Sequence, residues 1–593
     1  MLDRVKADLR FAGTLAKGAH MMLVTLRDGA RVSAARLVEE TARRDPDRTA
    51  LLFEDRRYSW REFDEAANRV ANVSRARGAE KGDVVALLMD NRPEYLITMI
   101  GLNKLGVVTS LVNTHVSGDP LVHALHICHP RFVLVGDEHL ENVREIEGRM
   151  PETVKGQILV WREKAETEVP AWAEAFDPLF AGASRANPGT TDEQTVDDAM
   201  LYMYTSGTTG LPKAAKIKNQ RFLRAAMSFG RHLAGLRPDD VTYLALPLYH
   251  ATGAVASFGS VVATGSAIAL RRRFSATQFW DDCVKYGVTG FNYIGEVCRY
   301  LLHTKTHPLE RKHKVRFMMG AGLRPDVWIP FQQRFGVPQV IEFYAATEGN
   351  VAIVNLDGTP GMLGRLMPGQ VVVKIDPDTE DFVRDERGHL VKAIAGESGI
   401  LVGRINTLNR FDGYLDTKKT DEKILRNAFG DGGDYFNTGD LVNLHPRGYV
   451  SFADRLGDTF RWKGENVSTN EMSIVLNRCP GVLESNVYGV EVPGAEGRAG
   501  MAAVSVGPEF DIQAFAKHCL DSLPRYSLPY FVRLQPQMEL TGSFKYVKTH
   551  LKRDGFDPSK VNEPLYFLDV VAKEYVPVTP ELFERISRGE VAV

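Results

Sequence analysis

The sequence predicts an α/β protein with wound sheets, and three observations support this fold class. Residues 35–125 alternate between helical and strand-like hydrophobic periodicity. The run Asp83–Met89 is continuously apolar after its first residue, which is typical of a strand buried on both faces of a parallel sheet. The chain has 593 residues, with 44% apolar and 25% charged side chains, and can therefore build the large core that such sheets need.

The elements at the start of the chain follow from local patterns. Ser59 is a plausible helix N-cap, and Glu62 three residues later completes a capping box. The alternation of helix and strand continues through Tyr95–Leu105 and Arg131–Val135. Residues 150–198 are rich in charge, proline and alanine, so we expect an irregular connection there.

Further along the chain, strands are expected at Ala199–Met203, at Asp240–His250, which ends in Pro, Tyr and His, and at Val315–Met319. A helix is expected at Arg221–Leu233. The last part of the chain, residues 459–593, has the pattern of a small α+β unit. Its expected helices and strands are Ser473–Asn477, Val482–Val492, Met501–Val506 and Ile512–Leu520.

Charge and cysteine usage narrow the class of protein. The net charge is −2, so the chain has no global field that would attract nucleic acid or an anionic membrane. The five cysteines are scattered and odd in number, which favours a reducing compartment over a disulfide framework. They are Cys128, Cys283, Cys298, Cys479 and Cys519.

Two apolar segments could be mistaken for membrane spans. Phe11–Leu26 is interrupted by Lys17 and His20, and it is expected to be either an amphipathic segment on a membrane surface or a disordered or docked N-terminal helix. Ala251–Leu270 carries no formal charge but is mostly Ala, Gly, Ser and Val, so we expect a buried helix followed by a strand. Neither segment requires a transmembrane span.

A stretch rich in hydroxyls and glycines follows the strand at 199–203. It reads Tyr204-Thr205-Ser206-Gly207-Thr208-Thr209-Gly210-Leu211-Pro212-Lys213. Glycines allow backbone N–H groups to face an anion, and hydroxyls add donors without charge. The same residues could form a simple surface turn. It is not a Walker loop, since Gly210 is followed by leucine and Lys213 by alanine.

Further strings suit a nucleotide. In Ile341–Gly349, Tyr344 could stack on adenine, Thr347 could donate to a phosphate, and Glu348 could hold Mg²⁺. The alternative is a strand-to-helix turn with Glu348 in the first helical turn. The string Gly320–Pro325 fails as a dinucleotide fingerprint, but its small residues allow a flat ring to approach the backbone.

The stretch 204–213 closely resembles the phosphate loop of the adenylate-forming superfamily, which contains acyl-CoA synthetases, peptide-synthetase adenylation domains and luciferases. The resemblance extends from about residue 35 to the end of the chain. It implies a large N-terminal domain of wound α/β sheets with a β-barrel-like part, and a small mobile α+β C-terminal domain. The implied divisions are 1–34 as an N-terminal segment, 35–455 as the large adenylation domain, 456–458 as a hinge and 459–593 as the small domain.

The resemblance assigns roles residue by residue. The expected ATP and AMP contacts are Thr205, Ser206, Gly207, Thr208, Thr209, Gly210, Lys213, Ala321, Gly322, Tyr344, Asp440 and Arg455. The expected catalytic residues are Lys545, Glu348 (also the Mg²⁺ ligand) and Thr347, with Lys548 as the fallback for Lys545. Lys463 and Gly464 are expected to face coenzyme A, and His250, Tyr293 and Gly295 to line the acyl pocket. The hinge is assigned to Gly457 and Asp458.

Two positions depart from the family's usual pattern. Phe544 stands where the family usually has a glycine before the catalytic lysine, and Gly457 stands where many relatives have Asp or Lys as the hinge. Glycine is compatible with a hinge, but the residue about which the chain turns is left open.

Three further strings are similar to the fatty-acid-transport-protein and very-long-chain acyl-CoA synthetase branch of this superfamily. They are Asn292–Leu302, Asp454–Ser468 and Glu496–Met501. This similarity implies ATP-dependent ligation of a long-chain or very-long-chain fatty acid to coenzyme A through an acyl-adenylate, with AMP and pyrophosphate as products and Mg²⁺ as cofactor.

Alternatives to this activity remain open. They are a bile-acid or sterol-type carboxylate as substrate, a carrier protein as acyl acceptor, and fatty-acid uptake coupled to activation. The expected location is the cytoplasm, with peripheral contact to the inner face of the cell membrane and a homodimer as further options.

Overall fold

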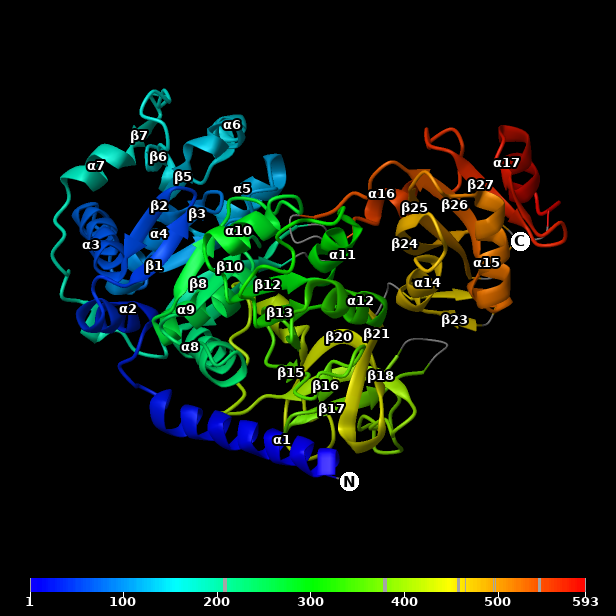
Figure 1. Cartoon of the computed structure of the whole chain (residues 1–593), viewed down its shortest axis with the longest axis horizontal. Coiled ribbons are helices and arrows are strands. Elements are labelled where there is room, and N and C mark those ends of the chain that lie inside the picture. Colours follow the sequence, from blue (N-terminus) through cyan, green and yellow to red (C-terminus); the bar gives the residue numbers. More distant parts are fainter. Residues whose placement is uncertain are drawn as a thin grey trace. The chain divides into compact units, whose positions relative to one another are not determined.

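The computed structural model describes residues 2–205, 211–376, 381–455, 459–463, 465–493, 495, 497–541, 546–591 and 593. The chain divides into two compact units (Figure 1). The first contains Met1–Gly364 and Arg404–Ile424, and the second contains Arg365–Gly403 and Leu425–Val593. The hinge predicted at 456–458 falls inside the second unit and outside the described residues, so the predicted division into four segments stays a prediction.

A seven-stranded sheet in the first unit carries the predicted phosphate loop. Its strand order is β7-β6-β5-β3-β4-β8-β9, and every neighbouring pair is parallel except β8 with β9. The strands are β3 (Val84–Leu88), β4 (Val108–Leu111), β5 (Phe132–Gly136), β6 (Ile158–Trp161), β7 (Ala173–Ala175), β8 (Ala199–Thr205) and β9 (Lys213–Lys218).

An eight-stranded sheet with the order β15-β14-β13-β12-β10-β11-β1-β2 completes the first unit. Its strands are β1 (Thr49–Phe53), β2 (Arg56–Ser59), β10 (Val241–Leu244), β11 (Ala267–Leu270), β12 (Gly290–Ile294), β13 (Phe317–Ala321), β14 (Gln339–Ala345) and β15 (Ala352–Val354). Strands β13 and β14 are parallel neighbours, so their carboxyl ends lie at the same edge. In open α/β sheets this edge is where ligands bind.

Helices cover these sheets and share one large apolar core with them, in which Trp60, Tyr95 and Tyr243 are buried. The α-helices are α1 (Leu2–His20), α2 (Ala34–Arg44), α3 (Trp60–Ala76), α4 (Pro93–Leu105), α5 (Gly118–Cys128), α6 (Leu140–Glu145), α7 (Phe176–Gly182), α8 (Asn219–Met227), α9 (Gly259–Thr264), α10 (Phe279–Lys285), α11 (Gly295–His303), α12 (Pro325–Phe335) and α13 (Thr417–Asp421). The π-helices are η1 (Met21–Thr25), η6 (Ser228–Leu233) and η7 (Thr252–Phe258). The short 3-10 helices are η2 (Asp137–His139), η3 (Glu147–Arg149), η4 (Glu152–Val154) and η5 (Thr191–Glu193).

Several local predictions are confirmed. Helix α3 begins with the predicted capping box between Ser59 and Glu62. The apolar segment 251–270 folds as helix η7–α9 followed by strand β11, as its composition indicated. One prediction was wrong, because residues 150–198 contain strands β6 and β7 and helix α7 where an irregular connection was expected. Strand β9, between the phosphate loop and helix α8, was not predicted.

The second unit contains a six-stranded sheet and a five-stranded sheet. The first has the order β16-β21-β20-β18-β17, with β19 on β20. Its strands are β16 (Gly364–Arg365), β17 (Gln370–Lys374), β18 (Ser398–Arg404), β19 (Ile424–Leu425), β20 (Tyr435–Leu444) and β21 (Tyr449–Arg455), with η8 (Pro446–Gly448) between the last two. This sheet corresponds to the predicted β-barrel-like part, and the predicted fold class is confirmed.

The five-stranded sheet has the order β24-β25-β26-β27-β28. It contributes to a separate apolar core that includes Trp462, Tyr488 and Phe531. Its strands are β24 (Val482–Glu491), β25 (Arg498–Val506), β26 (Pro529–Gln535), β27 (Leu565–Asp569) and β28 (Glu574–Pro577). The helices are α14 (Thr469–Leu476), α15 (Ile512–Ser522), α16 (Thr549–Asp554), α17 (Pro580–Ser587) and η9 (Arg525–Ser527), and β22 (Phe460–Trp462) pairs with β23 (Glu465–Val467) in a hairpin.

Candidate functional site

The two ends of the predicted phosphate loop are held together by strand pairing. Strands β8 and β9 are antiparallel, and Thr205 lies opposite Lys213 in their register. Residues 206–210 lie outside the described residues, so the roles of Ser206, Gly207, Thr208, Thr209 and Gly210 stay predictions. The structure therefore defines the base of the loop.

Tyr414 connects this base to the predicted magnesium ligand. Its ring centroid lies 5.9 Å from Nζ of Lys213, and its hydroxyl donates to Oε1 of Glu348 at 2.8 Å. The ring is only 2% exposed. Burial is the largest cause that raises the pKa of Tyr414, followed by the charge of Glu348, so the hydroxyl keeps its proton and remains a donor.

Backbone pairing explains why Tyr414 reaches this place. The backbone N–H of Lys216 donates to the carbonyl of Gly413 at 3.0 Å, and that of Leu415 donates to the carbonyl of Ala214 at 2.9 Å. Residues 413–415 thus add a short segment to the edge of β9. Sequence reasoning missed Tyr414, because the only signal is one aromatic residue after a glycine in a polar segment.

Arg221 of helix α8 holds the turn that carries Thr347 and Glu348 through hydrogen bonds to its backbone. One guanidinium donates to the carbonyl oxygens of Glu348 at 2.8 Å and Ala346 at 2.9 Å, and it also bonds the carbonyl of Gly349. Burial lowers the pKa of Arg221 to about 10, with the neighbouring Arg224 as the next cause. The guanidinium therefore remains charged at neutral pH. Sequence reasoning did not single out Arg221.

The predicted adenine-binding residues lie at the carboxyl edge of β13 and β14. Ala321 ends β13, and Gly322 follows with a positive φ of 79°. Tyr344 is the last residue but one of strand β14. Oε1 of Glu342 accepts the backbone N–H of Gly322 at 2.6 Å and that of Leu323 at 3.1 Å. A buried carboxyl group thus fixes the turn that follows β13.

Glu342 also accepts a hydrogen bond of 2.5 Å from the hydroxyl of Tyr293. Burial raises the pKa of Glu342 to about 8, while its three donors act in the opposite direction. Because Tyr293 is fully buried and uses its hydroxyl in this bond, its described contacts are those of a core residue. Its role in the acyl pocket stays a prediction.

The other two acyl-pocket candidates have structural contacts of their own. A Cβ atom on Gly295 would lie 2.0 Å from the carbonyl oxygen of Gly322, so this position requires glycine. The carbonyl of His250 accepts the N–H of Ala254 at 2.9 Å at the start of η7, and its ring lies 4.5 Å from that of Tyr249. Both residues keep their predicted roles as predictions.

In the second unit, the backbones of Asp440 and Arg455 lie directly opposite each other on β20 and β21. Gly439 has a φ of 76° within β20, and Asp440 is 7% exposed. The neighbouring Asp454 accepts the backbone N–H of Thr469 at 2.8 Å and its hydroxyl at 3.0 Å. The predicted ribose-binding pair is therefore brought together by strand register.

Several predicted residues of this unit lie outside the described residues, namely Gly457, Asp458, Gly464 and Lys545. Lys463, in the turn between β22 and β23, has a left-handed φ of 50°, and its Nζ bonds the backbone oxygen of Val593. Lys548, the fallback for the catalytic role of Lys545, donates from Nζ to the hydroxyl of Thr469 at 3.4 Å.

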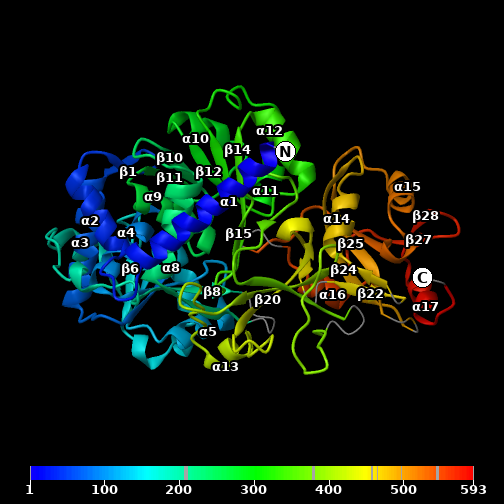
Figure 2. The ribbon, with the colours of Figure 1, turned by 90° about the horizontal axis from the view of Figure 1, so that it is seen from below.

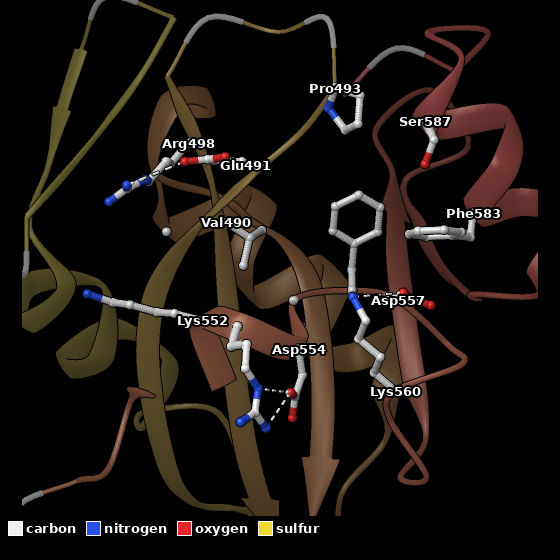
Figure 3. A pocket seen from close by; sticks show the side chains of 14 residues that line it. Val490, Glu491, Pro493, Arg498, Lys552, Asp554, Asp557, Lys560, Phe583 and Ser587 are labelled. Carbon is white, nitrogen blue, oxygen red and sulfur yellow. Dashed lines mark hydrogen bonds and ion pairs between the residues drawn. The ribbon is translucent and has the colours of Figure 1, made fainter. Parts of the chain in front are cut away.

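The second unit also contains an open pocket of about 400 Å³ (Figure 3). Its lining residues are Gly489, Val490, Glu491, Pro493, Arg498, Lys552, Arg553, Asp554, Gly555, Phe556, Asp557, Lys560, Phe583 and Ser587. Carboxylates pair with Arg553 at 2.9 Å, Lys560 at 3.2 Å and Arg498 at 3.5 Å. Among the described residues, none of the predicted site residues lines this pocket.

Asp90, Glu138 and His139 lie close enough for their ligand atoms to share a cation, but Arg273 already pairs with Asp90 and Arg92 with Glu138.

In the part of the chain that the structure describes, no helix combines the length and apolar character needed for a membrane span.

Comparison with known proteins shows the family to which the chain belongs. Residues 38–399 match the family of AMP-binding enzymes. Long-chain fatty acid transport protein 1 of Mus musculus is 40% identical over 94% of this chain and 88% of its own length. A medium/long-chain-fatty-acid–CoA ligase, FadD6 of Mycobacterium tuberculosis, is 38% identical over 99% of this chain and 96% of its own length.

Among solved structures, the anthranilate CoA ligase AuaEII in complex with anthranoyl-AMP has the same fold. Its TM-score is 0.74 at 22% identity, over 87% of this chain and 95% of that one. With the family match over residues 38–399 and relatives that align along nearly the whole length, the chain belongs to the AMP-binding enzyme family, in the adenylate-forming branch that contains the long-chain fatty acid transport proteins.

Proposed function

We propose that this protein is a long-chain-fatty-acid–CoA ligase that forms an acyl-adenylate from the fatty acid and ATP, and then transfers the acyl group to coenzyme A. The observation that carries this proposal is the convergence of Lys213, Tyr414 and Glu348 in the first unit. The relatives named as fatty acid transport protein and fatty-acid–CoA ligase, similar over nearly their whole length, support the substrate class.

The first half-reaction joins two anions. A carboxylate oxygen of the fatty acid attacks the α-phosphorus of ATP, and the bond from that phosphorus to the bridging oxygen breaks to release pyrophosphate. No protein nucleophile is needed, so the protein contributes position and positive charge. A unit charge about 4 Å away is worth roughly 4 kcal/mol at an effective dielectric near 20.

Lys545 is proposed to supply that charge between the carboxylate and the α-phosphate. Stabilisation of this size corresponds to about 10³ in rate. Lys213 and the hydroxyls of the phosphate loop are proposed to bind the other phosphates. Asp440 is proposed to accept the ribose hydroxyls, with Arg455 on the phosphate side and Tyr344, Ala321 and Gly322 around the adenine.

The described residues fit Mg²⁺ as the metal of this site. Mg²⁺ usually takes one or two carboxylates together with substrate phosphate oxygens and water. Glu348 offers a carboxylate whose Oε1 accepts a hydrogen bond from the hydroxyl of Tyr414. Glu348 would therefore hold the ion, which would neutralise phosphate charge when bound, and Thr347 is proposed to donate its hydroxyl to a phosphate.

In the second half-reaction the thiol of coenzyme A attacks the acyl carbon of the acyl-adenylate and AMP leaves. Lys463 and Gly464 are proposed to face the pantetheine chain, because a glycine allows a thin chain to pass close to the backbone. Gly457 and Asp458 are proposed as the hinge between the two half-reactions.

One experiment tests the function and its alternatives together. Purified protein is assayed for AMP formation with fatty acids of increasing chain length and with a sterol-type carboxylate, each with and without coenzyme A. We expect coenzyme A-dependent AMP formation that is largest for long chains. If AMP formation is fastest with the sterol-type acid, the substrate is a sterol-type carboxylate and not a long-chain fatty acid. If AMP forms only when an acyl carrier protein is the acceptor, the assignment of coenzyme A as acceptor is refuted.

A second proposal concerns location: a cytoplasmic protein whose N-terminal helix lies on the inner face of the cell membrane. Leu9, Leu23 and Val24 of α1 and η1 are 67%, 62% and 56% exposed, which is high for large apolar side chains. Lys17 and His20 lie between them in sequence, as is typical of a segment on an anionic surface. A homodimer is also proposed, and light scattering would test it.

A further inference from the structure

The turn that carries Thr347 and Glu348 depends on contacts from two distant parts of the first unit. Arg221, in helix α8, binds the carbonyl oxygens of Ala346, Glu348 and Gly349. Tyr414, from the segment that pairs with β9, binds the carboxylate of Glu348. One residue therefore holds the backbone of the turn, and the other holds its acidic side chain.

We propose that Arg221 and Tyr414 are positioning residues that set the orientation of Glu348, and hence the affinity of the site for Mg²⁺ with ATP. The inference rests on the proposed function, since it takes Glu348 as the magnesium ligand. It goes beyond that assignment because neither Arg221 nor Tyr414 belongs to the nucleotide-binding motifs of the sequence.

The chemistry of Arg221 explains why this position needs a guanidinium. A turn whose carbonyl groups point inward needs donors that reach several oxygens at once, since buried carbonyls without partners are costly. Arginine presents five N–H donors in a planar fork, whereas lysine presents one ammonium group on a flexible stem. Lysine at position 221 would keep the charge but could not bond all these carbonyl oxygens in the same geometry.

The chemistry of Tyr414 concerns the carboxylate itself. A hydroxyl that donates to Oε1 restricts rotation of the carboxylate and leaves Oε2 as the oxygen with which Glu348 can meet a cation. Groups that orient metal ligands in this way commonly contribute ten- to a hundredfold to metal affinity or activity. The turn is anchored on its other side too, because the side chain of Asn350 donates to the carbonyls of Arg404 and Asn409, each at 3.0 Å.

The chain offers matched controls for both positions. Arg224 belongs to the same helix and donates to the carbonyl of Leu408 at 3.1 Å, away from the turn at 346–349. Tyr243 is a buried tyrosine whose hydroxyl donates to the carboxylate of Asp282 at 3.1 Å in the core. Arg224→Lys and Tyr243→Phe thus lose the same kinds of bond without touching Glu348.

The test measures Mg²⁺ dependence in the full-length protein. ATP–pyrophosphate exchange is titrated with Mg²⁺ at fixed ATP, and ATP binding is measured by calorimetry with Mg²⁺ and with a chelator. We expect Arg221→Lys and Tyr414→Phe to raise the half-saturating Mg²⁺ concentration by about tenfold or more. They should also weaken ATP binding in Mg²⁺ while leaving binding in chelator within about twofold, and the two controls should match the wild type in Mg²⁺ dependence.

Two outcomes separate the possible failures. If Arg221→Lys and Tyr414→Phe lower the melting temperature but keep the wild-type Mg²⁺ dependence, the two residues only stabilise the fold and the positioning role is overturned. If the wild type itself forms no acyl-CoA, the proposed function fails instead, and the calorimetric comparison of Mg²⁺ with chelator still decides whether the two residues set metal affinity.

Discussion

Lys545 is the residue on which the proposed first half-reaction depends. Lys545→Ala should reduce fatty-acid-dependent pyrophosphate release by about 10³, because the charge between the two anions is lost. Thioester formation from preformed acyl-adenylate should be largely spared. Both rates can be measured with labelled pyrophosphate and with a thiol assay.

Lys548→Ala is the matched variant for this prediction. Lys548 lies three positions further on and contacts the hydroxyl of Thr469 at 3.4 Å. If pyrophosphate release is lost in Lys548→Ala and retained in Lys545→Ala, the catalytic role belongs to Lys548.

Glu342 gives a prediction about pH. Its pKa is raised from 4.5 to about 8, so the folded protein holds one more proton than the unfolded chain in that interval. The contribution of this group to stability is therefore fully present below pH 4.5 and is lost as the pH rises toward 8. A difference of one proton corresponds to a slope of about 1.4 kcal/mol per pH unit.

Glu342→Gln should remove this slope, because the amide does not titrate. The measurement is the free energy of unfolding by denaturant across that pH range, compared between wild type and variant. Equal slopes in the two proteins would show that Glu342 is ionised in the folded state throughout.

At the scale of elements, the close approach of helix α11 to the turn after β13 gives a further prediction. A Cβ atom at position 295 would lie 2.0 Å from the carbonyl oxygen of Gly322, which borders the proposed adenine site. Gly295→Ala should cost about 1–3 kcal/mol of stability by overpacking and should also weaken ATP binding.

Gly182→Ala is a suitable control for this variant, because nothing lies within 4 Å of a Cβ atom built there. Thermal unfolding and calorimetric ATP binding would check both proteins. A Gly295→Ala protein that binds ATP as the wild type does would show that the turn is not part of the nucleotide site.

The elements also show what the sequence could and could not predict. Strands β3 and β13 are continuous runs without a polar side chain, and α3 has a capping box, so their patterns are local and strong. Strand β9 has lysine at three of its six positions, which hides its two-residue period. Strands β6 and β7 and helix α7 lie within a charged segment, so composition suggested a loop.

The residues of the candidate site also differ in whether the sequence could predict them. Motifs predict roles for Lys213, Tyr344 and Glu348, because their neighbours in sequence form recognisable strings. Tyr414 is 66 positions from Glu348 in sequence, and Arg221 is 127 positions away, so these contacts exist only once the sheets have formed. Periodicity and composition carry no information about such pairs.

At the scale of the whole molecule, helix α1 gives a prediction about membranes. Its N-terminal end lies near α12 and β14 in the first unit (Figure 2). Leu9 and Lys17 of this helix help to line an open pocket of about 830 Å³. Replacing Leu23 and Val24 together by aspartate should reduce sedimentation with anionic vesicles several-fold, since apolar contact is lost and two negative charges are added that an anionic surface repels.

Activity on fatty acid delivered in detergent micelles should change less than twofold in this double variant, which controls for folding. Sedimentation that matches the wild type would place the membrane contact elsewhere or remove it. Neutral vesicles provide the comparison that separates apolar contact from charge attraction.

The pairing of Thr205 with Lys213 has a consequence for protein engineering. Both ends of the intervening segment are fixed on adjacent strands, and the entropic cost of closing a loop depends on its length, which a linker of equal length keeps. Residues 206–210 should therefore be exchangeable for a glycine–serine linker of equal length as a cassette. The resulting protein should melt near the wild-type temperature and yet bind no ATP. It would then be a folded, inactive reference protein that differs from the wild type at no more than five residues.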